Sequence, residues 1–384
     1  MGEIKTGIIS RQTFWGYIII ILSGIQYSFL YTNIEIPAYG ILDKIFFMIY
    51  FFVFALFLLE NRYTYSIFKK IVLLFLCSLL LGSYSFTQLI IFAIICAHLS
   101  YKNIFRTLGI IRFLAFLLVM LFALLNIFDI HQIEIYKAGQ IVVGNGLGYS
   151  HPNRCAMVIA FLIILYIGWK NKQFRIVDGI FCVAISAVGY WLTKSRTLVV
   201  IVFFAIVFNL GIHSKLFVNF WKKTISTISL VVMPACAFFS CYMAIAIGTG
   251  GKFGRIADSL NVLFSLRFTH INRVFRYYPL TIFGGITNFS VIEDMFGYGT
   301  IDNGYIFLIY RFGIAGFLAF IILSTLAIIQ LNKKKEYTYI IIYIITSIWA
   351  VSENILVNFA FNLVVVFWGE LIVTQKRLLI KLRK

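Results

Sequence analysis

The chain has 384 residues, of which 61% are hydrophobic and only 12% are charged, and its formal net charge is +19. Soluble globular domains carry about 25% charged residues, so this chain cannot cover a water-facing surface and most of it is expected to face lipid. A strongly basic protein can bind nucleic acid, but here most of the basic residues lie between apolar runs. Basic residues in this position are typical of the cytoplasmic loops between membrane helices, and we expect no nucleic-acid partner.

Apolar runs of the length of a membrane helix recur along the whole chain. We expect about twelve, near 14–31, 41–59, 71–83, 86–99, 110–128, 152–169, 176–193, 197–212, 224–247, 303–330, 337–352 and 356–374. The third and fourth runs are short and fit either a tight helical hairpin or a re-entrant pair, so the count ranges from eleven to thirteen. No small-residue cleavage site follows the first run, which predicts a membrane helix and no cleaved signal peptide. The sequence therefore predicts an all-α polytopic membrane protein with a single membrane domain, residues 1–384.

The basic residues indicate the orientation of the chain. Twenty-two of the 33 Lys and Arg residues fall in segments that are inside if the N-terminus is inside, namely 1–13, 60–70, 100–112, 170–175, 213–223, 331–336 and 375–384. The positive-inside rule then places both termini in the cytoplasm, and the tail 375–384 is expected on anionic lipid head groups. Two notable segments are outside, 129–151 and the large loop 248–302, and a loop as long as the second is usually functional.

The remaining basic residues lie where the charge rule disfavours them. Seven of these eleven are arginine, and the full set is Lys44, Lys137, Arg154, Lys194, Arg196, Lys252, Arg255, Arg267, Arg273, Arg276 and Arg311. The planar fork of arginine binds phosphate through two hydrogen bonds, which lysine cannot do. This bias predicts an outward-facing site for an anionic ligand, most simply a lipid-linked diphosphate. The alternative is scattered interfacial charge that contacts lipid phosphates.

Five of these seven arginines lie in three places in the chain. Arg196 and Lys194 lie in a short turn that enters the eighth helix. The segment 267–278 has the apolar spacing of an amphipathic helix at the membrane surface, with Arg267 and Arg273 on its polar side and Pro279 at its end.

Arg311 lies inside the tenth run, nine residues beyond Asp302 and therefore about 13 Å deeper. A charge at that depth costs about 2.5–3.5 kcal/mol and must face a cavity or a partner. Glu353 is the candidate partner, and a functional site and a structural ion pair both remain open.

Few side chains can act as a general base. Asp302 opens the tenth helix beside Asn303, where a carboxylate can also be an ordinary helix cap. His151 precedes Pro152 at the start of the sixth helix, and His270 lies among the loop arginines. The six cysteines are in no CxxC or Cys/His cluster, so membrane packing is the simplest interpretation. We expect no metal site and no cofactor.

Four stretches resemble, in the same order, the O-antigen ligase and Wzy-type polysaccharide polymerase superfamily. They are GLGYSHPNRCA, TKSRTLVVIVFFA, SLRFTHINRVFRYYPLTIFGG and IDNGYIFLIYRFGIAGFLAF, and together they cover roughly residues 145–320. The resemblance implies a GT-C-like glycosyltransferase in the bacterial cytoplasmic membrane. Such polymerases join oligosaccharide repeat units, carried on undecaprenyl diphosphate, at the outer face of that membrane to make capsule, exopolysaccharide or O-antigen.

The resemblance also implies roles for particular residues. Arg196 and Arg267 match the two key arginines, which neutralise the leaving diphosphate without a metal. Asp302 stands where ligases carry a histidine, which favours a polymerase and leaves open whether Asp302 is the base. The same stretches supply the residues expected to bind substrate: His151, Asn153, Arg154, Lys194, His270, Arg273, Arg276, Asn303, Tyr305 and Arg311. The implied partners are the lipid-linked oligosaccharide, membrane lipids, a flippase and a chain-length regulator.

Other functions remain as alternatives. A ligase would transfer the glycan to a different acceptor. A flippase for the same lipid-linked anion would place arginines along the middle of several helices, whereas here they cluster at outer ends, with Arg311 as the exception. A non-catalytic scaffold would not need Arg196, Arg267 and Asp302 together.

Overall fold

The computed structural model describes residues 11–29, 32, 39–60, 65–80, 84–128, 130, 132–137, 140–214, 217–286, 288–297, 299–357, 361–369 and 371. Over these residues the chain is a helical bundle whose one sheet is a two-stranded hairpin. The predicted all-α class holds for this part of the chain. Residues 1–10 and the basic tail 375–384, both expected at the cytoplasmic face, lie outside the described residues.

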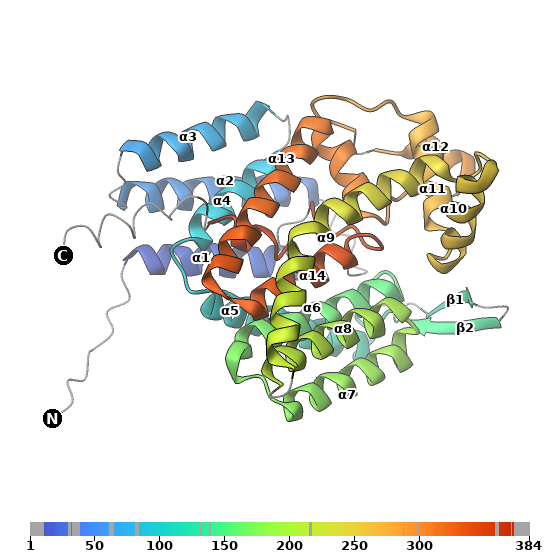
Figure 1. The fold of residues 1–384 in the computed structure, drawn as a ribbon, viewed down its shortest axis with the longest axis horizontal. Helices are drawn as coiled ribbons and strands as arrows, with labels where there is room; N and C mark the ends of the chain where they lie inside the picture. The colour runs from blue at the N-terminus through green and yellow to red at the C-terminus, as the bar shows by residue number, and fades with distance from the viewer. Residues whose placement is uncertain are drawn as a thin grey trace.

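Eleven of the twelve predicted runs coincide with helices of the bundle. These are α1 (Arg11–Ser28), α2 (Tyr39–Glu60), α3 (Tyr65–Leu80), α4 (Tyr84–Cys96), α5 (Tyr101–Leu124), α6 (Pro152–Lys170), α7 (Ile176–Thr193), α8 (Arg196–His213), α9 (Val218–Ala246), α13 (Gly304–Lys334) and α14 (Tyr337–Trp349). Within the described ranges, six helices are long and apolar enough to cross a membrane: α5, α6 with the 3-10 turn η1 (Asn171–Gln173), α7, α8, α9 and α13. α1, α2, α7 and α8 run along the long axis of the molecule (Figure 1).

The short helix α4 is a buried element. Its residues from Phe86 to Cys96 are all nearly inaccessible, and α4 packs against α1, α2 and α3. Ser78 of α3 and Thr87 of α4 also share a hydrogen bond of 3.0 Å. A helix that is apolar on every side belongs in a core. Burial inside the protein therefore explains why this run is shorter than a lipid-facing span.

The twelfth predicted run, 356–374, is not a continuous helix in its described part. Residues 361–369 form turns and the 3-10 turn η2 (Val365–Phe367), and all of them are buried. η2 packs against α4 and α13, and Trp368 donates a hydrogen bond to the Ser324 hydroxyl at 3.0 Å. The prediction of a helix was wrong because apolarity alone does not distinguish a segment buried in protein from one that faces lipid.

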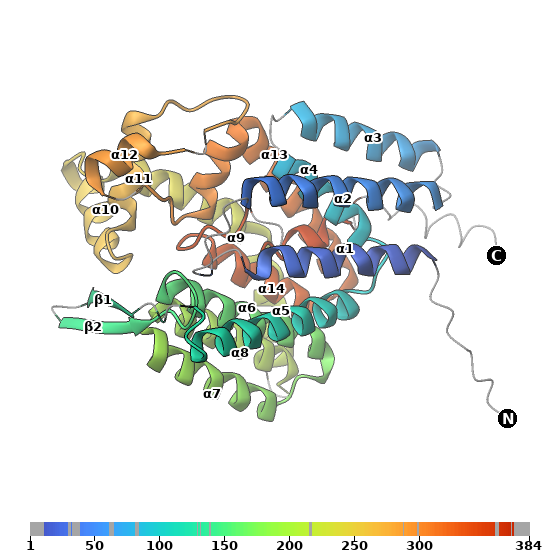
Figure 2. The same ribbon diagram turned by 180° about the vertical axis from the view of Figure 1, so that it is seen from behind.

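One end of the bundle carries the irregular parts of the chain, and we call it the hairpin end. The strands β1 (Gln132–Lys137) and β2 (Gln140–Asn145) pair antiparallel there, from Gln132 opposite Asn145 to Lys137 opposite Gln140. The loop helices α10 (Gly251–Leu263), α11 (Arg267–Tyr277) and α12 (Ser290–Phe296) lie at the same end (Figures 1 and 2). The two segments predicted to lie outside the membrane therefore meet at one end of the molecule.

The loop helix α11 confirms the predicted amphipathic helix but corrects its surroundings. Ile271 and Val274 of the predicted apolar face are 1% and 2% exposed, and α11 packs on α9. The apolar face therefore packs against protein instead of a membrane surface. Packing fixes the orientation of α11, and its polar side chains lie on the opposite side.

The helix α13 was predicted as one span but is broken at Gly313, whose φ and ψ are 71° and 176°. The freed N–H groups of Ile314 and Ala315 donate to the carbonyls of Thr281 and Ile282, each at 3.0 Å. A side chain at Gly313 would lie 2.4 Å from the Ile282 oxygen, so only glycine permits this approach. The break thereby anchors residues 281 and 282 of the large loop beside α13.

Candidate functional site

Two arginines and two carboxylates from four separate segments form a charged network at the hairpin end. Arg154 lies in the first turn of α6, Arg267 begins α11, Asp302 lies two residues before α13, and Glu353 follows α14. Arg154 and Asp302 form an ion pair of 3.8 Å, and Arg267 and Glu353 form one of 3.1 Å. We call these four residues the charged network. Two of them, Arg154 and Glu353, lie outside the large loop 248–302.

The pair between Arg267 and Glu353 is the more deeply buried of the two. The Glu353 residue is 4% exposed, and Arg267 Nη1 donates to its Oε1 at 3.1 Å. Burial raises the pKa of the Glu353 carboxyl, while the positive charges of Arg267 and Arg154 oppose that shift. Burial disfavours the charged form of any carboxyl. Glu353 is therefore a carboxylate that would accept a proton more readily than an exposed one.

Glu353 had been predicted as the partner of Arg311, and the structure corrects this. Arg311 lies in α13, two residues before the break at Gly313, and its Nη2 donates to the Ser85 hydroxyl of α4 at 2.9 Å. Glu353 pairs instead with Arg267. Ser85 lies more than two hundred residues earlier in the chain, so no local pattern indicated that it is the partner of Arg311.

Asp302 is not the cap of α13, because its neighbour takes that position. Asn303 Oδ1 accepts a hydrogen bond from the Ile306 N–H at 2.9 Å, while its amide donates to Ser240 and to the Val351 carbonyl. Asp302 is partly exposed and holds Arg154. Asn303 therefore caps α13. The Asp302 carboxylate does not cap the helix and belongs to the charged network.

Two predicted substrate-binding residues are inside the protein core. Asn303 and Tyr305 are both 0% exposed. The amide of Asn303 is bonded as described, and the Tyr305 hydroxyl donates to the Ser347 carbonyl at 2.8 Å. Their contacts join α13 to α9 and to the end of α14. We therefore assign them a structural role and do not place them on the surface of the site.

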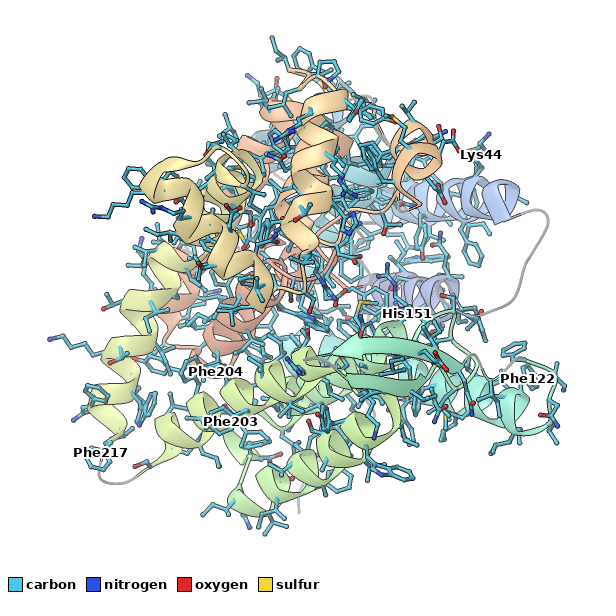
Figure 3. The ribbon with its side chains drawn as sticks, turned by 90° about the vertical axis from the view of Figure 1, so that its right-hand side faces the viewer. Lys44, Phe122, His151, Phe203, Phe204 and Phe217 are labelled. Atoms are coloured by element: carbon cyan, nitrogen blue, oxygen red, sulfur yellow. The ribbon has the colours of Figure 1, made fainter. Side chains whose placement is uncertain are left out.

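The start of α6 brings His151 and Asn153 beside Arg154. His151 Nδ1 accepts a hydrogen bond from the Asn153 backbone N–H at 3.0 Å and so caps the helix. An accepting Nδ1 requires the proton of a neutral imidazole to be on Nε2. In the view onto the hairpin end, His151 lies near the middle of the molecule, whereas Lys44 lies at its edge (Figure 3). Lys44 is thus a peripheral charge.

The polar side of α11 adds His270, Arg273 and Arg276. His270 is half-buried, and burial lowers the pKa of its imidazole, with Arg273 acting in the same direction and Asp302 against it. The Arg273 guanidinium lies over the Phe296 ring, 4.2 Å from its centroid, a favourable cation–π arrangement. Arg276 is exposed in the last turn of α11. Of the three, His270 is the residue whose pKa is affected by the charge of Asp302, and this interaction connects it to the charged network.

The turn that carries Lys194 and Arg196 lies beside the start of α6, because Gly144 of β2 is closely flanked by both Thr193 and Pro152. Lys194 has φ of 56° and its Nζ lies 5.9 Å from the Trp191 ring centroid. Arg196 is exposed, and within the described part of the chain its guanidinium makes no hydrogen bond or ion pair. Arg196 is therefore at the hairpin end but outside the charged network.

Arg112 was not among the predicted site residues, because it falls in the segment 100–112 that was predicted to be cytoplasmic. Arg112 lies halfway along α5 and is 3% exposed. Its guanidinium lies 4.8 Å from the Phe361 ring centroid and 5.9 Å from that of Phe161. A charge within a membrane segment is by default a functional candidate. The available signal was one arginine with apolar residues on both sides.

The described residues contain no group of three or more His, Cys, Asp or Glu side chains placed to hold a metal ion. The cysteines are free thiols, and the charged network offers two carboxylates that are each already paired with arginine. The arrangement can bind an anion through its arginines and can exchange a proton through its carboxylates.

The fold and the apolar helices define an all-α protein embedded in a membrane. Beyond that class, the chain matches no protein-family model, no curated protein and no solved structure.

Proposed function

We propose that the protein is a polysaccharide polymerase, a membrane glycosyltransferase that joins undecaprenyl-diphosphate-linked oligosaccharide repeat units at the outer face of the bacterial cytoplasmic membrane. The observation that carries this proposal is the charged network, in which two arginines and two carboxylates converge at the hairpin end. With it we propose a GT-C-like arrangement of about twelve membrane crossings, the last made by the buried segment that contains residues 361–369, and cytoplasmic termini. The hairpin end then faces outward.

The chemistry of the proposed reaction needs the two kinds of group that the charged network contains. The acceptor hydroxyl gives its proton to a carboxylate, its oxygen bonds to the anomeric carbon, and the bond from that carbon to the diphosphate oxygen breaks. Arginines placed in advance stabilise the negative charge that develops on the leaving diphosphate. A carboxylate with a raised pKa is suited to take the proton.

The structure favours Glu353 as a candidate base beside the predicted Asp302. Glu353 is buried and its pKa is raised. In the proposed mechanism, the diphosphate binds Arg267 and displaces Glu353, which is then available for the acceptor hydroxyl. Arg154 and Asp302 form the second pair, and we propose that Arg154 provides the second contact to the diphosphate. Arg196, exposed at the same end, would meet the sugar or phosphate as it enters.

The test is polymer formation in vesicles that contain the purified protein and an undecaprenyl-diphosphate-linked repeat unit. Loss of one donor to a developing oxyanion typically lowers the rate about 10²–10³-fold, and we expect that loss for Arg267→Gln. Arg255→Gln is the matched control, because Arg255 is exposed on α10 and its Nε bonds only the Gly251 carbonyl of its own helix at 3.3 Å. Full activity of Arg267→Gln would overturn the proposal.

A flippase for the same lipid-linked anion is the second candidate, and Arg112 is the observation that favours it. Arg112 and Arg311 both lie within bundle helices, and a translocation path needs charges along its length. The two functions differ in where single repeat units accumulate when Arg267 is changed. They collect at the outer face if polymerisation has failed and at the inner face if translocation has failed, and the latter result would replace the polymerase proposal.

A further inference from the structure

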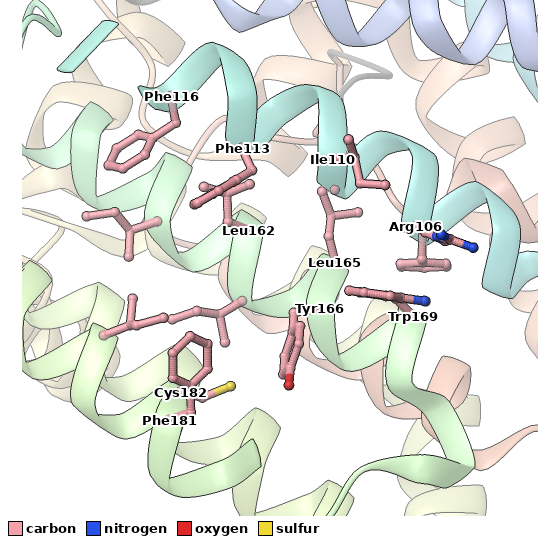
Figure 4. Close-up of a pocket in the computed structure, with 15 residues that line it drawn as sticks. Arg106, Ile110, Phe113, Phe116, Leu162, Leu165, Tyr166, Trp169, Phe181 and Cys182 are labelled. Atoms are coloured by element: carbon pink, nitrogen blue, oxygen red, sulfur yellow. The ribbon is translucent and has the colours of Figure 1, made fainter. Parts of the chain in front are cut away.

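A second site of different chemistry lies on the side of the bundle, between α5, α6 and α7. There the three helices enclose a cavity of about 300 Å³ (Figure 4). α5 and α7 each pack on α6, which forms the floor of this groove. Phe113 and Phe181 on the two walls are 50% and 54% exposed. Because these rings face outward from an apolar bundle, the groove opens towards lipid.

The groove has the length of one lipid chain. Its lining on α5 runs from Phe105 to Phe116, and eleven residues of helix span about 16 Å. The hydrocarbon core of a bilayer is about 30 Å thick, so the groove covers about one leaflet. The missing side chain of Gly109 leaves part of this space open, because a β-carbon there would meet only Leu165, at 3.7 Å.

One end of the groove is cationic. Arg106 is exposed and lies over the Trp169 ring, 5.7 Å from its centroid (Figure 4). The neighbouring cations are engaged, since Lys170 pairs with Asp178 at 3.0 Å and Lys102 donates to Gln173 at 3.2 Å. Within the described ranges, Arg106 has no carboxylate partner. Among the residues that line the groove, Arg106 is the one with a charge, so it is the cation placed to meet an anion at the mouth.

The groove is separate from the charged network. α5 ends just before the hairpin, so Arg106 near its start lies towards the opposite end of the bundle. A tryptophan and an arginine side by side are typical of the head-group level of a membrane. An apolar slot one leaflet long, whose lining has one cation at the head-group end, matches a phospholipid with a negative head group.

We propose that this groove binds an anionic phospholipid, with one acyl chain between α5 and α7 and the head-group phosphate on Arg106. The occupant belongs to the leaflet opposite the hairpin end. This inference does not rest on the proposed glycosyl transfer. Arg106 makes the groove prefer a negatively charged head group. The apolar walls of the groove bind the acyl chain.

The first experiment uses the full-length protein in vesicles that contain phosphatidylglycerol with a photoreactive diazirine in its acyl chain. After irradiation, peptides of α5 and α7 that include Phe113 and Phe181 should carry the label, more strongly than peptides of the exposed face of α9. The label should fall when unlabelled phosphatidylglycerol competes, and much less when phosphatidylcholine competes. Uniform labelling of all lipid-facing helices, or equal competition by the two lipids, would overturn the proposal.

The second experiment measures which lipid the purified protein retains, by native mass spectrometry. One basic residue at an anionic lipid surface corresponds to about a fivefold change in binding. The preference for phosphatidylglycerol over phosphatidylcholine should therefore be about fivefold smaller for Arg106→Gln than for the unaltered protein. Lys172→Gln, which removes an exposed cation of the neighbouring η1, should keep the preference. Gly109→Leu should lower retention of both lipids. Displacement of the bound lipid by undecaprenyl phosphate at equal concentration would assign the groove to a polyprenyl chain instead and reject the phospholipid.

Discussion

The buried pair between Arg267 and Glu353 allows a prediction with a definite magnitude. Two unit charges 3.1 Å apart attract by about 5 kcal/mol at an effective dielectric constant of about 20. Arg267→Met leaves the carboxylate of Glu353 buried without its partner, a change that typically costs about 3–5 kcal/mol. Arg154 also acts on Glu353 and supplies part of the missing charge. We therefore expect a loss of about 3 kcal/mol in the free energy of unfolding at pH 7.5.

The double variant separates the ion pair from other effects of the substitution. Glu353→Gln keeps the volume of the side chain, and Arg267, with 18% of its side chain exposed, can then be hydrated. We expect Arg267→Met to cost little when Glu353 is already Gln, which gives a coupling energy of about 2 kcal/mol. The measurement is chemical unfolding of the four proteins in detergent micelles. A coupling energy below about 0.5 kcal/mol would refute the assignment of a strong buried pair.

The same variants carry a pH signature. A carboxyl whose pKa is raised in the folded protein adds stability that is fully present below the unfolded value, near 4.3, and is lost as the pH rises through the folded value. The pKa of Glu353 is raised, and removal of Arg267 raises it further because that cation opposes the shift. Arg267→Met should therefore recover part of its lost stability at pH 5. An unchanged deficit at pH 5 would contradict a buried carboxylate as its origin.

Three further predictions concern the surroundings of the charged network. Gly313→Ala places a β-carbon 2.4 Å from the Ile282 oxygen at a residue with φ of 71°, and it should destabilise the protein by about 1–3 kcal/mol. Gly285 has open space around it, so Gly285→Ala should leave the free energy of unfolding almost unchanged in the same assay. The pKa of His270 is lowered by burial, so the folded state loses stability as the pH falls below the unfolded pKa near 6.5. His270→Gln should therefore lose less stability than the unaltered protein between about pH 7 and 5.5. Identical profiles of stability against pH for the two proteins would contradict this prediction. Asn303→Ala removes a helix cap and two buried hydrogen bonds, which should lower the free energy of unfolding by about 2–4 kcal/mol, with exposed Asn288→Ala as the control.

The sequence predicted the fold well wherever one local pattern decides the structure. Runs of apolar residues located eleven helices of the bundle, and apolar spacing located α11 and its packed face. Pro152 marked the start of α6, and the loop 248–302 contains three helices. These predictions depend on composition and periodicity, which act over a few turns. The orientation of the chain and the family resemblance remain predictions.

Errors arose where distant segments decide the structure. The run 356–374 is apolar because α4 and α13 surround part of it, and no local pattern distinguishes this burial from exposure to lipid. The break at Gly313 depends on the carbonyls of Thr281 and Ile282, more than thirty residues earlier in the chain. Ion pairing was likewise non-local. The sequence placed Arg267 and Glu353 at the same end of the protein but paired Glu353 with the wrong arginine.

The pairing of every member of the charged network has a consequence for the proposed reaction. Arg154 and Arg267 already hold Asp302 and Glu353, so a phosphate anion must compete with a carboxylate for each arginine. A displaced Glu353 stays in a buried place, where its charged form is disfavoured. Binding of the diphosphate to Arg267 therefore raises the proton affinity of the Glu353 carboxylate. The carboxylate that the ligand releases is the one best suited to receive the proton of the acceptor hydroxyl, so one ion pair can both hold the empty site together and prepare the base when substrate arrives.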